Sequence, residues 1–167
     1  MMTLAASMER IQPSSQAASS RMARVRQTGT KAEIALRREL HRMGLRYRVN
    51  VQVLLKPRRI ADVVFPKLKI AIFVDGCFWH GCPEHSTWPK RNAEFWKQKI
   101  EANQVRDTDT DTKLREIGWT VLRFWEHELP VAAAITVKSV IDAIKSRCKQ
   151  SLGQQDNIEL KPDGTHE

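Results

Sequence analysis

The sequence has no long apolar run and few cysteines. No stretch approaches the roughly 18 apolar residues that a membrane-spanning helix needs, and the first 20 residues contain Glu9 and Arg10 where a signal peptide would be apolar. Three cysteines in 167 residues do not make a disulfide framework, and a chain of this length can bury a core without one. The sequence therefore predicts a cytoplasmic, nucleoid-associated protein with no membrane partner.

Acidic residues are outnumbered by basic ones. The chain has 28 Lys and Arg against 19 Asp and Glu, which gives a formal net charge of +9. Each phosphate that Lys or Arg neutralises releases condensed counterions, so this excess favours a polyanionic partner such as DNA. Many basic proteins bind no nucleic acid, so the charge favours this partner without identifying it.

The ends of the chain differ in composition from its centre. Residues 1–28 are rich in Ser, Ala, Gln and Arg, which predicts a mobile basic arm. Its charged stretch consists of Arg21, Arg24 and Arg26, although the arm could equally be a leader without function. Residues 29–149 form the predicted folded domain. The polar, turn-rich residues 150–167 predict a disordered tail.

The central region has a mixed pattern of helices and strands. Thr30 and Glu33 have the spacing of a capping box, and a helix that begins there is expected to end at Gly44. Strand-like runs and two further helical stretches follow in the order strands, long helix, strand, helix. They are strands at 47–55, 60–65, 68–74 and 119–125, and helices at 92–117 and 131–144. This order predicts an α/β domain with a mixed sheet flanked by helices.

Potential zinc ligands are concentrated after the third strand-like run. Cys77, Cys82 and His85 follow the pattern C-x4-C-x2-H in a loop that also contains Gly and Pro. Structural zinc requires four such ligands in a tetrahedron, and His127, just after the last strand, is the best candidate for the fourth. The pattern predicts a structural zinc loop. The alternatives are that the cysteines are packed thiols and that His127 is a surface histidine.

Two aspartates lie in or at the end of apolar strands. Asp62 and Asp75 would be costly there without a partner. Carboxylates on adjacent strands can share a divalent cation such as Mg²⁺, which suits phosphodiester hydrolysis, and the nearby His80 could act as a general base or acid. Alternatively, Asp75 belongs to a strand-end turn and Asp62 forms an ion pair with Arg58 or Arg59.

Six segments of the chain match a known pattern, at 61–65, 73–85, 92–96, 103, 106–107 and 118–127. Together they resemble one known family, the very short patch repair (Vsr) DNA mismatch endonucleases. The similarity covers roughly residues 20 to 130, and the GCFWHGCPEH stretch is its most specific part. The resemblance implies a restriction-endonuclease-like fold and a Mg²⁺-dependent nick 5′ to the thymine of a T:G mismatch. Such mismatches arise when 5-methylcytosine deaminates.

The resemblance implies roles for the acidic residues and the histidine. Asp62 matches the catalytic, metal-binding aspartate of the family, and His80 matches the catalytic histidine. Glu33 matches a supporting acid on the first helix, with the capping box as its alternative role. Where the best-known member of the family has Thr-His, this chain has Val74-Asp75, and Asp75 restores the second carboxylate usual in restriction-like nucleases.

The resemblance also implies DNA contacts. Phe78, Trp79 and Trp96 match aromatic residues that wedge into the base stack beside the mismatch, where unstacking costs less than in paired DNA. Packing in the core is the alternative for these rings. Three further positions match residues that approach the mismatched pair: Met22, Lys99 and Asn103.

The zinc ligands depart from the family pattern. Cys82 and His85 replace a closer-spaced His and Cys, and His127 occupies a cysteine position. The expected ligand set is therefore Cys2His2, which zinc accepts. Restriction-like nucleases would also have a lysine two residues after Asp75, but Cys77 occupies that position, which leaves His80 as the stand-in.

Two other functions remain open at this stage. One is a restriction-type nuclease without a strict mismatch requirement, and the other is a non-catalytic, zinc-stabilised DNA-binding module. Nicking one strand needs only a monomer, so a monomer is expected. The resemblance implies double-stranded DNA with a T:G mismatch as the partner, and other mismatch-repair proteins remain a further option.

Overall fold

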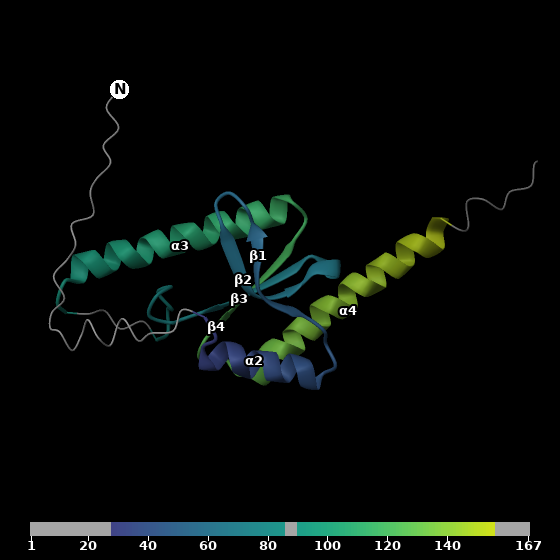
Figure 1. Ribbon diagram of the computed structural model, residues 1–167, viewed down its shortest axis with the longest axis horizontal. Coiled ribbons are helices and arrows are strands. Elements are labelled where there is room, and N and C mark those ends of the chain that lie inside the picture. The colour runs from purple at the N-terminus through teal and green to yellow at the C-terminus, as the bar shows by residue number, and fades with distance from the viewer. Residues whose placement is uncertain (1–27, 86–89, 156–167) are drawn as a thin grey trace, which may run out of the picture.

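The computed structural model describes residues 28–85 and 90–155, and the basic arm with Met22, Arg21, Arg24 and Arg26 lies outside these ranges. The part that is described contains three α-helices, four strands and one short 3-10 helix, and we keep the labels of Figure 1 for them. The helices are α2 (Lys31–Arg42), α3 (Ala93–Glu116) and α4 (Pro130–Gln155). The strands are β1 (Arg48–Leu54), β2 (Arg59–Phe65), β3 (Ile70–Asp75) and β4 (Thr120–Trp125), and η1 is Pro66–Leu68.

The four strands form one mixed sheet in the order β1-β2-β3-β4. β1 and β2 are antiparallel, as are β2 and β3, whereas β3 and β4 are parallel. Parallel neighbours need a long crossover, and α3 provides it between β3 and β4. The predicted mixed α/β architecture is therefore confirmed.

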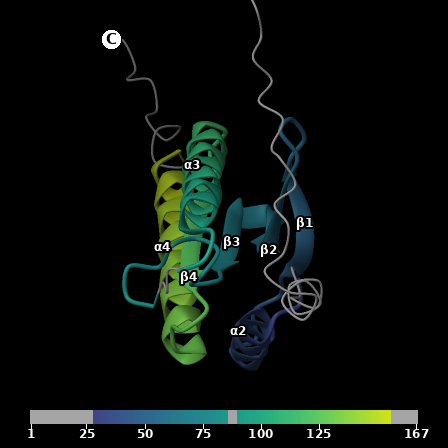
Figure 2. The ribbon, with the colours of Figure 1, turned by 90° about the vertical axis from the view of Figure 1, so that its left-hand side faces the viewer.

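Helices cover both faces of the sheet (Figures 1 and 2). One core cluster joins Leu36 and Leu40 of α2 and Val137 of α4 to alternate residues of β2 and β3. The second core cluster lies on the opposite face, where Leu114 of α3 packs with Phe73 and its neighbours. Strands buried on both faces explain why β2 and β3 are almost continuously apolar, and why a carboxylate within them is conspicuous.

The start of α2 follows from its sequence. The Thr30 hydroxyl accepts a hydrogen bond from the Glu33 amide, and the Glu33 carboxylate accepts one from the Thr30 amide, so the predicted capping box is confirmed. The helix ends just before Gly44, which has a φ of +73°. Only glycine adopts this left-handed conformation without strain.

Two element boundaries differ from the prediction by two residues or more. β3 begins at Ile70 rather than at residue 68, because the segment starting at Pro66 forms a 3-10 turn. α4 continues to Gln155, well past residue 144, since no Pro or Gly occurs between Ile144 and Gly153. Residues 150–155 are therefore helical rather than part of a tail. Within the described ranges, no helix has both the length and the apolar character needed to cross a membrane.

Candidate active site and metal centre

The parallel pairing of β3 and β4 brings the two functional loops together. Asp75 at the end of β3 is in register with Trp125 at the end of β4. The Glu126 amide donates to the Asp75 carbonyl at 2.9 Å, which continues the pairing beyond the strands. The loop after β3 and the residues after β4 consequently share one edge of the sheet, although 50 residues separate Cys77 from His127.

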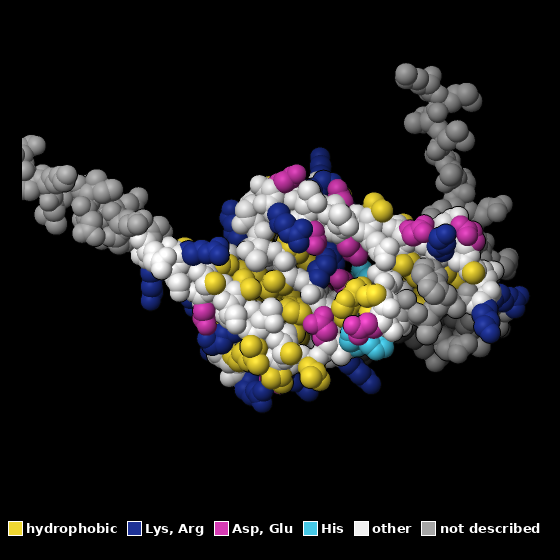
Figure 3. All heavy atoms as spheres, turned by 180° about the vertical axis from the view of Figure 1, so that it is seen from behind, with side chains coloured by type: hydrophobic (Ala, Val, Ile, Leu, Met, Phe, Trp, Pro, Cys, Tyr) yellow, Lys and Arg dark blue, Asp and Glu magenta, His cyan; other side chains and the backbone are white. Residues whose placement is uncertain are grey.

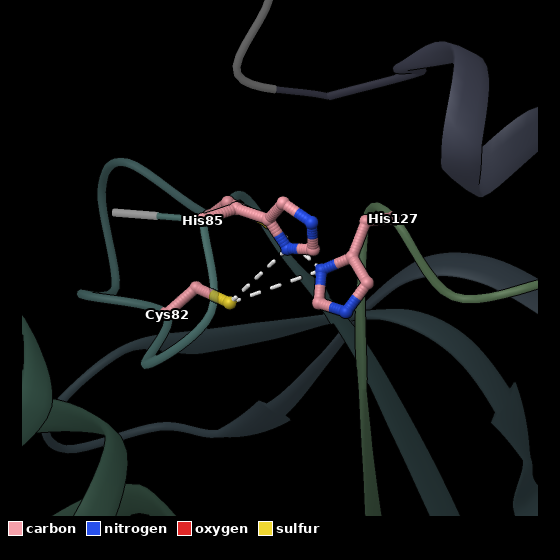
Figure 4. A group of neighbouring side chains, drawn as sticks. Cys82, His85 and His127 are labelled. Atoms are coloured by element: carbon pink, nitrogen blue, oxygen red, sulfur yellow. Dashed lines mark hydrogen bonds between the residues drawn. The ribbon is translucent and has the colours of Figure 1, made fainter. Parts of the chain in front are cut away.

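The four predicted zinc ligands meet at this edge. One ligand atom each from Cys77, Cys82, His85 and His127 lies within 4.8 Å of the other three. Nδ1 of His127 lies 3.1 Å from Sγ of Cys77 and 3.8 Å from Sγ of Cys82. Nδ1 of His85 lies 4.0 Å from Sγ of Cys82, and Figure 4 shows both rings directed at this sulfur.

These residues fit a tetrahedral metal site. Zinc–sulfur bonds of about 2.3 Å and zinc–nitrogen bonds of about 2.0 Å place tetrahedral ligands roughly 3.3–3.8 Å apart, close to the separations observed here. Burial, together with the Cys82 thiol, raises the pKa of Cys77 to about 11, so Cys77 would become a thiolate near neutral pH only with a bound cation to stabilise it. Nε2 of His127 lies 3.5 Å from the Glu84 carboxylate, an outer partner of the kind that orients metal-binding histidines.

Asp62 lies within β2 and faces the neighbouring strand β3. Its Oδ2 accepts a hydrogen bond of 2.8 Å from the Val74 amide. Burial raises the pKa of Asp62 to about 6, and the negative charges of Glu33 and Asp75 add to the shift, while the Val74 hydrogen bond opposes it. The predicted alternative partner, Arg59, instead pairs with Asp109 and Thr110 on α3.

Glu33 makes the contacts of the capping box and also lies close enough to Asp62 for its charge to act there. Its carboxylate accepts the capping hydrogen bonds from Gly29 and Thr30. The same carboxylate pairs with Arg37 at 2.8 Å, and Arg37 also donates to the Asp62 carbonyl at 3.2 Å. Glu33 is therefore both the helix cap and an acid whose charge affects Asp62.

His80 is held by two carboxylates. Its Nδ1 lies 2.5 Å from Oδ2 of Asp107 and 3.7 Å from Oδ1 of Asp75. Burial lowers the pKa of His80, but the Asp107 hydrogen bond and the charges of Asp75 and Asp107 outweigh it, so the net shift is upward. With Nδ1 occupied in this way, Nε2 is the ring nitrogen that can exchange a proton with a substrate.

Arg123 contacts the carboxylates of Asp75, Asp107 and Asp111, which together with His80 form an acidic group. Its Nη1 donates to both oxygens of Asp75 at 2.8 Å. Its Nη2 lies 3.3 Å from Oδ1 of Asp107, and its Nε donates to Asp111 at 2.9 Å. Burial raises the pKa of Asp75 and Arg123 opposes that shift. The predicted strand-end aspartate thus has an arginine partner that sequence reasoning did not find.

The three predicted wedge residues form one aromatic cluster. The rings of Phe78, Trp79 and Trp96 meet edge to face, with centroids 5.2–5.9 Å apart. All three are partly exposed and belong to neither core cluster. This arrangement is unlike core packing and presents aromatic surface beside the acidic group. On the face shown in Figure 3, histidine side chains lie next to acidic and hydrophobic ones.

The two α3 residues expected near the mismatch differ in their surroundings. Asn103 is buried, and its amide nitrogen donates to the Trp79 carbonyl at 2.8 Å while its oxygen accepts from Arg106. Asn103 therefore fastens the Trp79 loop to α3. Lys99 is half-buried one turn earlier on the same helix. Met22 lies outside the described residues.

Three residues of the site were missed from the sequence: Arg37, Asp107 and Arg123. Arg123 interrupts the apolar run of β4, and a charge within such a run signals a buried partner. Asp107 opens the Asp-Thr repeat of α3, where Asp111 lies one turn further on the same helix face. These two signals together point to a carboxylate–arginine group between α3 and β4.

Gly81 lets the loop approach α3 closely. Its φ is +65°, and a Cβ there would lie 2.8 Å from Ile100 and 2.6 Å from Gln104. We expect Gly81→Ala to lower the free energy of unfolding by about 2–3 kcal/mol, because it adds backbone strain and a clash. Gly44→Ala is the matched control, with a similar φ but no atom within 4 Å. Equal losses in urea unfolding would contradict the close approach.

Comparison with known proteins identifies related sequences. The family described as DNA mismatch endonuclease Vsr matches residues 12–86. The type II nicking enzyme V.NaeI of Lentzea aerocolonigenes is 44% identical over 62% of this chain and 63% of its own length. That coverage is slightly less than two thirds of the relative. The chain is also similar to a second nicking enzyme, V.NmeDIP of Neisseria meningitidis serogroup C, with 39% identity over 71% of this chain and 80% of the relative.

A relative with a mismatch-repair name also matches. The DNA mismatch endonuclease Vsr of Escherichia coli strain K12 is 34% identical over 61% of this chain and 64% of its own length. The relatives thus include enzymes named for nicking and an enzyme named for mismatch cleavage.

Proposed function

The chain belongs to the family of Vsr DNA mismatch endonucleases. From this premise we propose that it is a DNA endonuclease that nicks one strand immediately 5′ of the thymine in T:G mismatches. These mismatches would be those left by deamination of 5-methylcytosine. The observation that supports the proposal best is His80, bound to Asp107 beside Asp75, at the edge of the sheet where the exposed aromatic cluster also lies.

The proposed reaction is metal-assisted hydrolysis of a phosphodiester. Asp62 and Asp75 would hold Mg²⁺, which supplies charge neutralisation at the phosphate and an acidified water. His80 would move a proton through Nε2, and Asp107 would hold Nδ1 so that the ring keeps its orientation. Glu33 would contribute negative charge beside Asp62. Strands β2 and β3 with their carboxylates suit a restriction-endonuclease-like fold.

The second metal would be structural. Cys77, Cys82, His85 and His127 would hold Zn²⁺. Because the zinc ligands begin two residues after Asp75, the ion would fix the loop that includes His80. It would thereby connect the end of β3 to the end of β4 without taking part in the reaction.

DNA recognition would combine stacking and charge. Phe78, Trp79 and Trp96 would wedge beside the mismatched pair, whose reduced stacking lowers the cost of opening. Lys99 would approach the same place, and Asn103 would hold the Trp79 loop in position. The basic arm with Met22, Arg21, Arg24 and Arg26 would add contacts to the DNA. We propose a monomer that works in the cytoplasm, at the nucleoid.

The test compares two labelled duplexes. The full-length protein with Mg²⁺ is incubated with a duplex that has a T:G mismatch in a cytosine-methylation context and with its fully paired counterpart. A nick in the mismatched duplex alone, directly 5′ of the thymine, is the expected result. Failure to cut any of several sequence contexts while binding them would leave a zinc-stabilised binding module.

A less selective nuclease is the second candidate. Five of the relatives are named type II nicking enzymes rather than mismatch enzymes. Cutting of both duplexes at similar rates would favour this function over mismatch repair. The catalytic group and both metal sites would be the same in either case.

The aromatic cluster gives a prediction about selectivity. Trp79→Ala is expected to reduce nicking of the mismatched duplex by about tenfold, since stacking of one base on an aromatic ring contributes roughly 1–3 kcal/mol. Single-turnover rates on mismatched and paired duplexes measure the effect. Trp119→Ala serves as the control, because Trp119 packs against the core cluster under α3 instead. An unchanged rate for Trp79→Ala would contradict wedging.

A further inference from the structure

The acidic group around His80 has the composition of a second metal site. Ligand atoms of Asp75, His80 and Asp107 lie within 4.8 Å of one another. Two carboxylates and an imidazole at this spacing are a set that divalent cations accept. All three belong to the proposed catalytic centre. The number of cations bound by them would therefore determine how much positive charge faces the DNA phosphate that is cut.

A guanidinium already occupies this group. Arg123 donates to both oxygens of Asp75 at 2.8 Å, and its Nη2 lies 3.3 Å from the carboxylate of Asp107. Its remaining nitrogen, Nε, donates to Asp111 at 2.9 Å. Each of the three guanidinium nitrogens is therefore directed at a carboxylate.

Packing fixes the guanidinium in this position. Its central carbon lies 4.6 Å from the centroid of the Phe73 ring, and the side chain of Arg123 is only 21% exposed. An arginine held by a ring and three carboxylates retains its charge and its geometry. A divalent cation placed between Asp75 and Asp107 would have to displace this guanidinium or lie against its positive charge in a partly buried setting, where charges are weakly screened. Each carboxylate oxygen has a second lone pair, so Asp75 can still accept a further ligand on the side away from the guanidinium.

We propose that Arg123 takes the place of a second divalent cation, so that the centre holds one divalent cation, shared by Asp62 and Asp75. Arg123 is in this sense a positioning residue. It holds both oxygens of Asp75 and Oδ1 of Asp107, whose Oδ2 lies 2.5 Å from Nδ1 of His80. The count of one rests on the proposed metal-dependent function, whereas the exclusion of a cation from the group around His80 rests on Arg123 alone.

Counting bound Mn²⁺ tests this proposal without any measurement of nicking. The zinc-loaded, full-length protein is titrated with Mn²⁺, and free Mn²⁺ is followed by electron paramagnetic resonance. The wild type is expected to bind one Mn²⁺ and Arg123→Met two, because the substitution frees the carboxylates of Asp75 and Asp107. Arg115→Met is the matched control, since Arg115 also pairs with Asp111 but is 59% exposed, and it should bind one.

A stability measurement covers the case in which Arg123→Met folds poorly. The variant leaves three carboxylates without their shared cation, so its melting temperature should fall in metal-free buffer. Millimolar Mn²⁺ should restore it by several degrees more than it raises the wild type, and the added substitution Asp107→Asn should abolish the difference.

The outcomes separate the two proposals. Two Mn²⁺ ions in the wild type, or an unchanged count in Arg123→Met without the Mn²⁺-dependent recovery of stability, would overturn the role of Arg123 even if the protein nicks mismatched DNA. One Mn²⁺ in the wild type and two in the variant would support that role even if no mismatched duplex is cut.

Discussion

Asp62→Asn is expected to abolish nicking and at the same time to stabilise the fold. The loss of the carboxylate removes the proposed metal ligand, so the rate should fall by on the order of a thousandfold, equivalent to about 4 kcal/mol. The asparagine side chain can still accept the Val74 hydrogen bond. The local geometry is therefore retained while the charge is lost.

The gain in stability follows from the environment of Asp62. Burial, with Glu33 and Asp75 nearby, raises its pKa from 3.8 to about 6. Because the folded state disfavours the charged form, the carboxylate destabilises the protein above pH 6, and this penalty disappears as the pH falls from about 6 toward 4. At pH 8, in metal-free buffer, Asp62→Asn should raise the free energy of unfolding by about 1–3 kcal/mol.

Melting curves at two pH values give the measurement. The variant should melt several degrees above the wild type at pH 8, and the two should converge near pH 4. Mg²⁺ should raise the melting temperature of the wild type but not that of the variant. Asp142→Asn, which removes an exposed carboxylate paired with Lys138 on α4, should change neither nicking nor stability appreciably. A destabilised Asp62→Asn protein at pH 8 would contradict this account.

The order of the elements could be predicted because local signals agree with the tertiary structure. The capping box at Thr30 and Glu33 sets the start of α2, and the apolar runs that become β2 and β3 are buried on both faces of the sheet. The end of α4 could not be predicted, because the polar residues after Ile144 are compatible with either a helix or a tail. Helix propensity without an apolar face leaves that choice open.

The site was predictable where its residues are close in sequence. Cys77, Cys82 and His85 fall within one loop, so their spacing indicates a metal. His127 required the inference that β3 and β4 end at the same edge, which their parallel pairing bears out. Arg123 and Asp107 depend on how α3 crosses β4, and no pattern within a single element gives that crossing.

The resemblance pointed to Glu33 but did not indicate which contacts its carboxylate makes. Glu33 was expected to be either a helix cap or a catalytic acid, and in the structure its carboxylate accepts the capping hydrogen bond and also pairs with Arg37. Arg37 makes this combination tolerable because it pairs with Glu33 and also donates to the Asp62 carbonyl. A buried acid with a nearby cation can serve folding and electrostatics together.

Loss of the proposed zinc site should have the largest effect on stability. Cys82 is fully buried, and its sulfur lies within 4.0 Å of both histidine nitrogens of the group. Cys82→Ser is expected to lose the bound zinc, to lower the melting temperature by roughly 10 °C or more, and to abolish nicking, since structural zinc contributes on the order of 10 kcal/mol in small modules. Zinc released from denatured protein should be one equivalent for the wild type.

Two further variants distinguish the loss of a zinc ligand from the loss of any cysteine. Cys148→Ser replaces the exposed third cysteine and should keep one equivalent of zinc. His127→Cys should also keep it, because zinc accepts three cysteines and one histidine, and Co²⁺ substitution should then show stronger sulfur-to-metal absorption. That change would place residue 127 in the coordination sphere. If Cys82→Ser retained its zinc, or if the wild type held none and melted at the same temperature as the variant, the cysteines would be packed thiols and the loop would depend on Gly81 and Asn103 alone for its position.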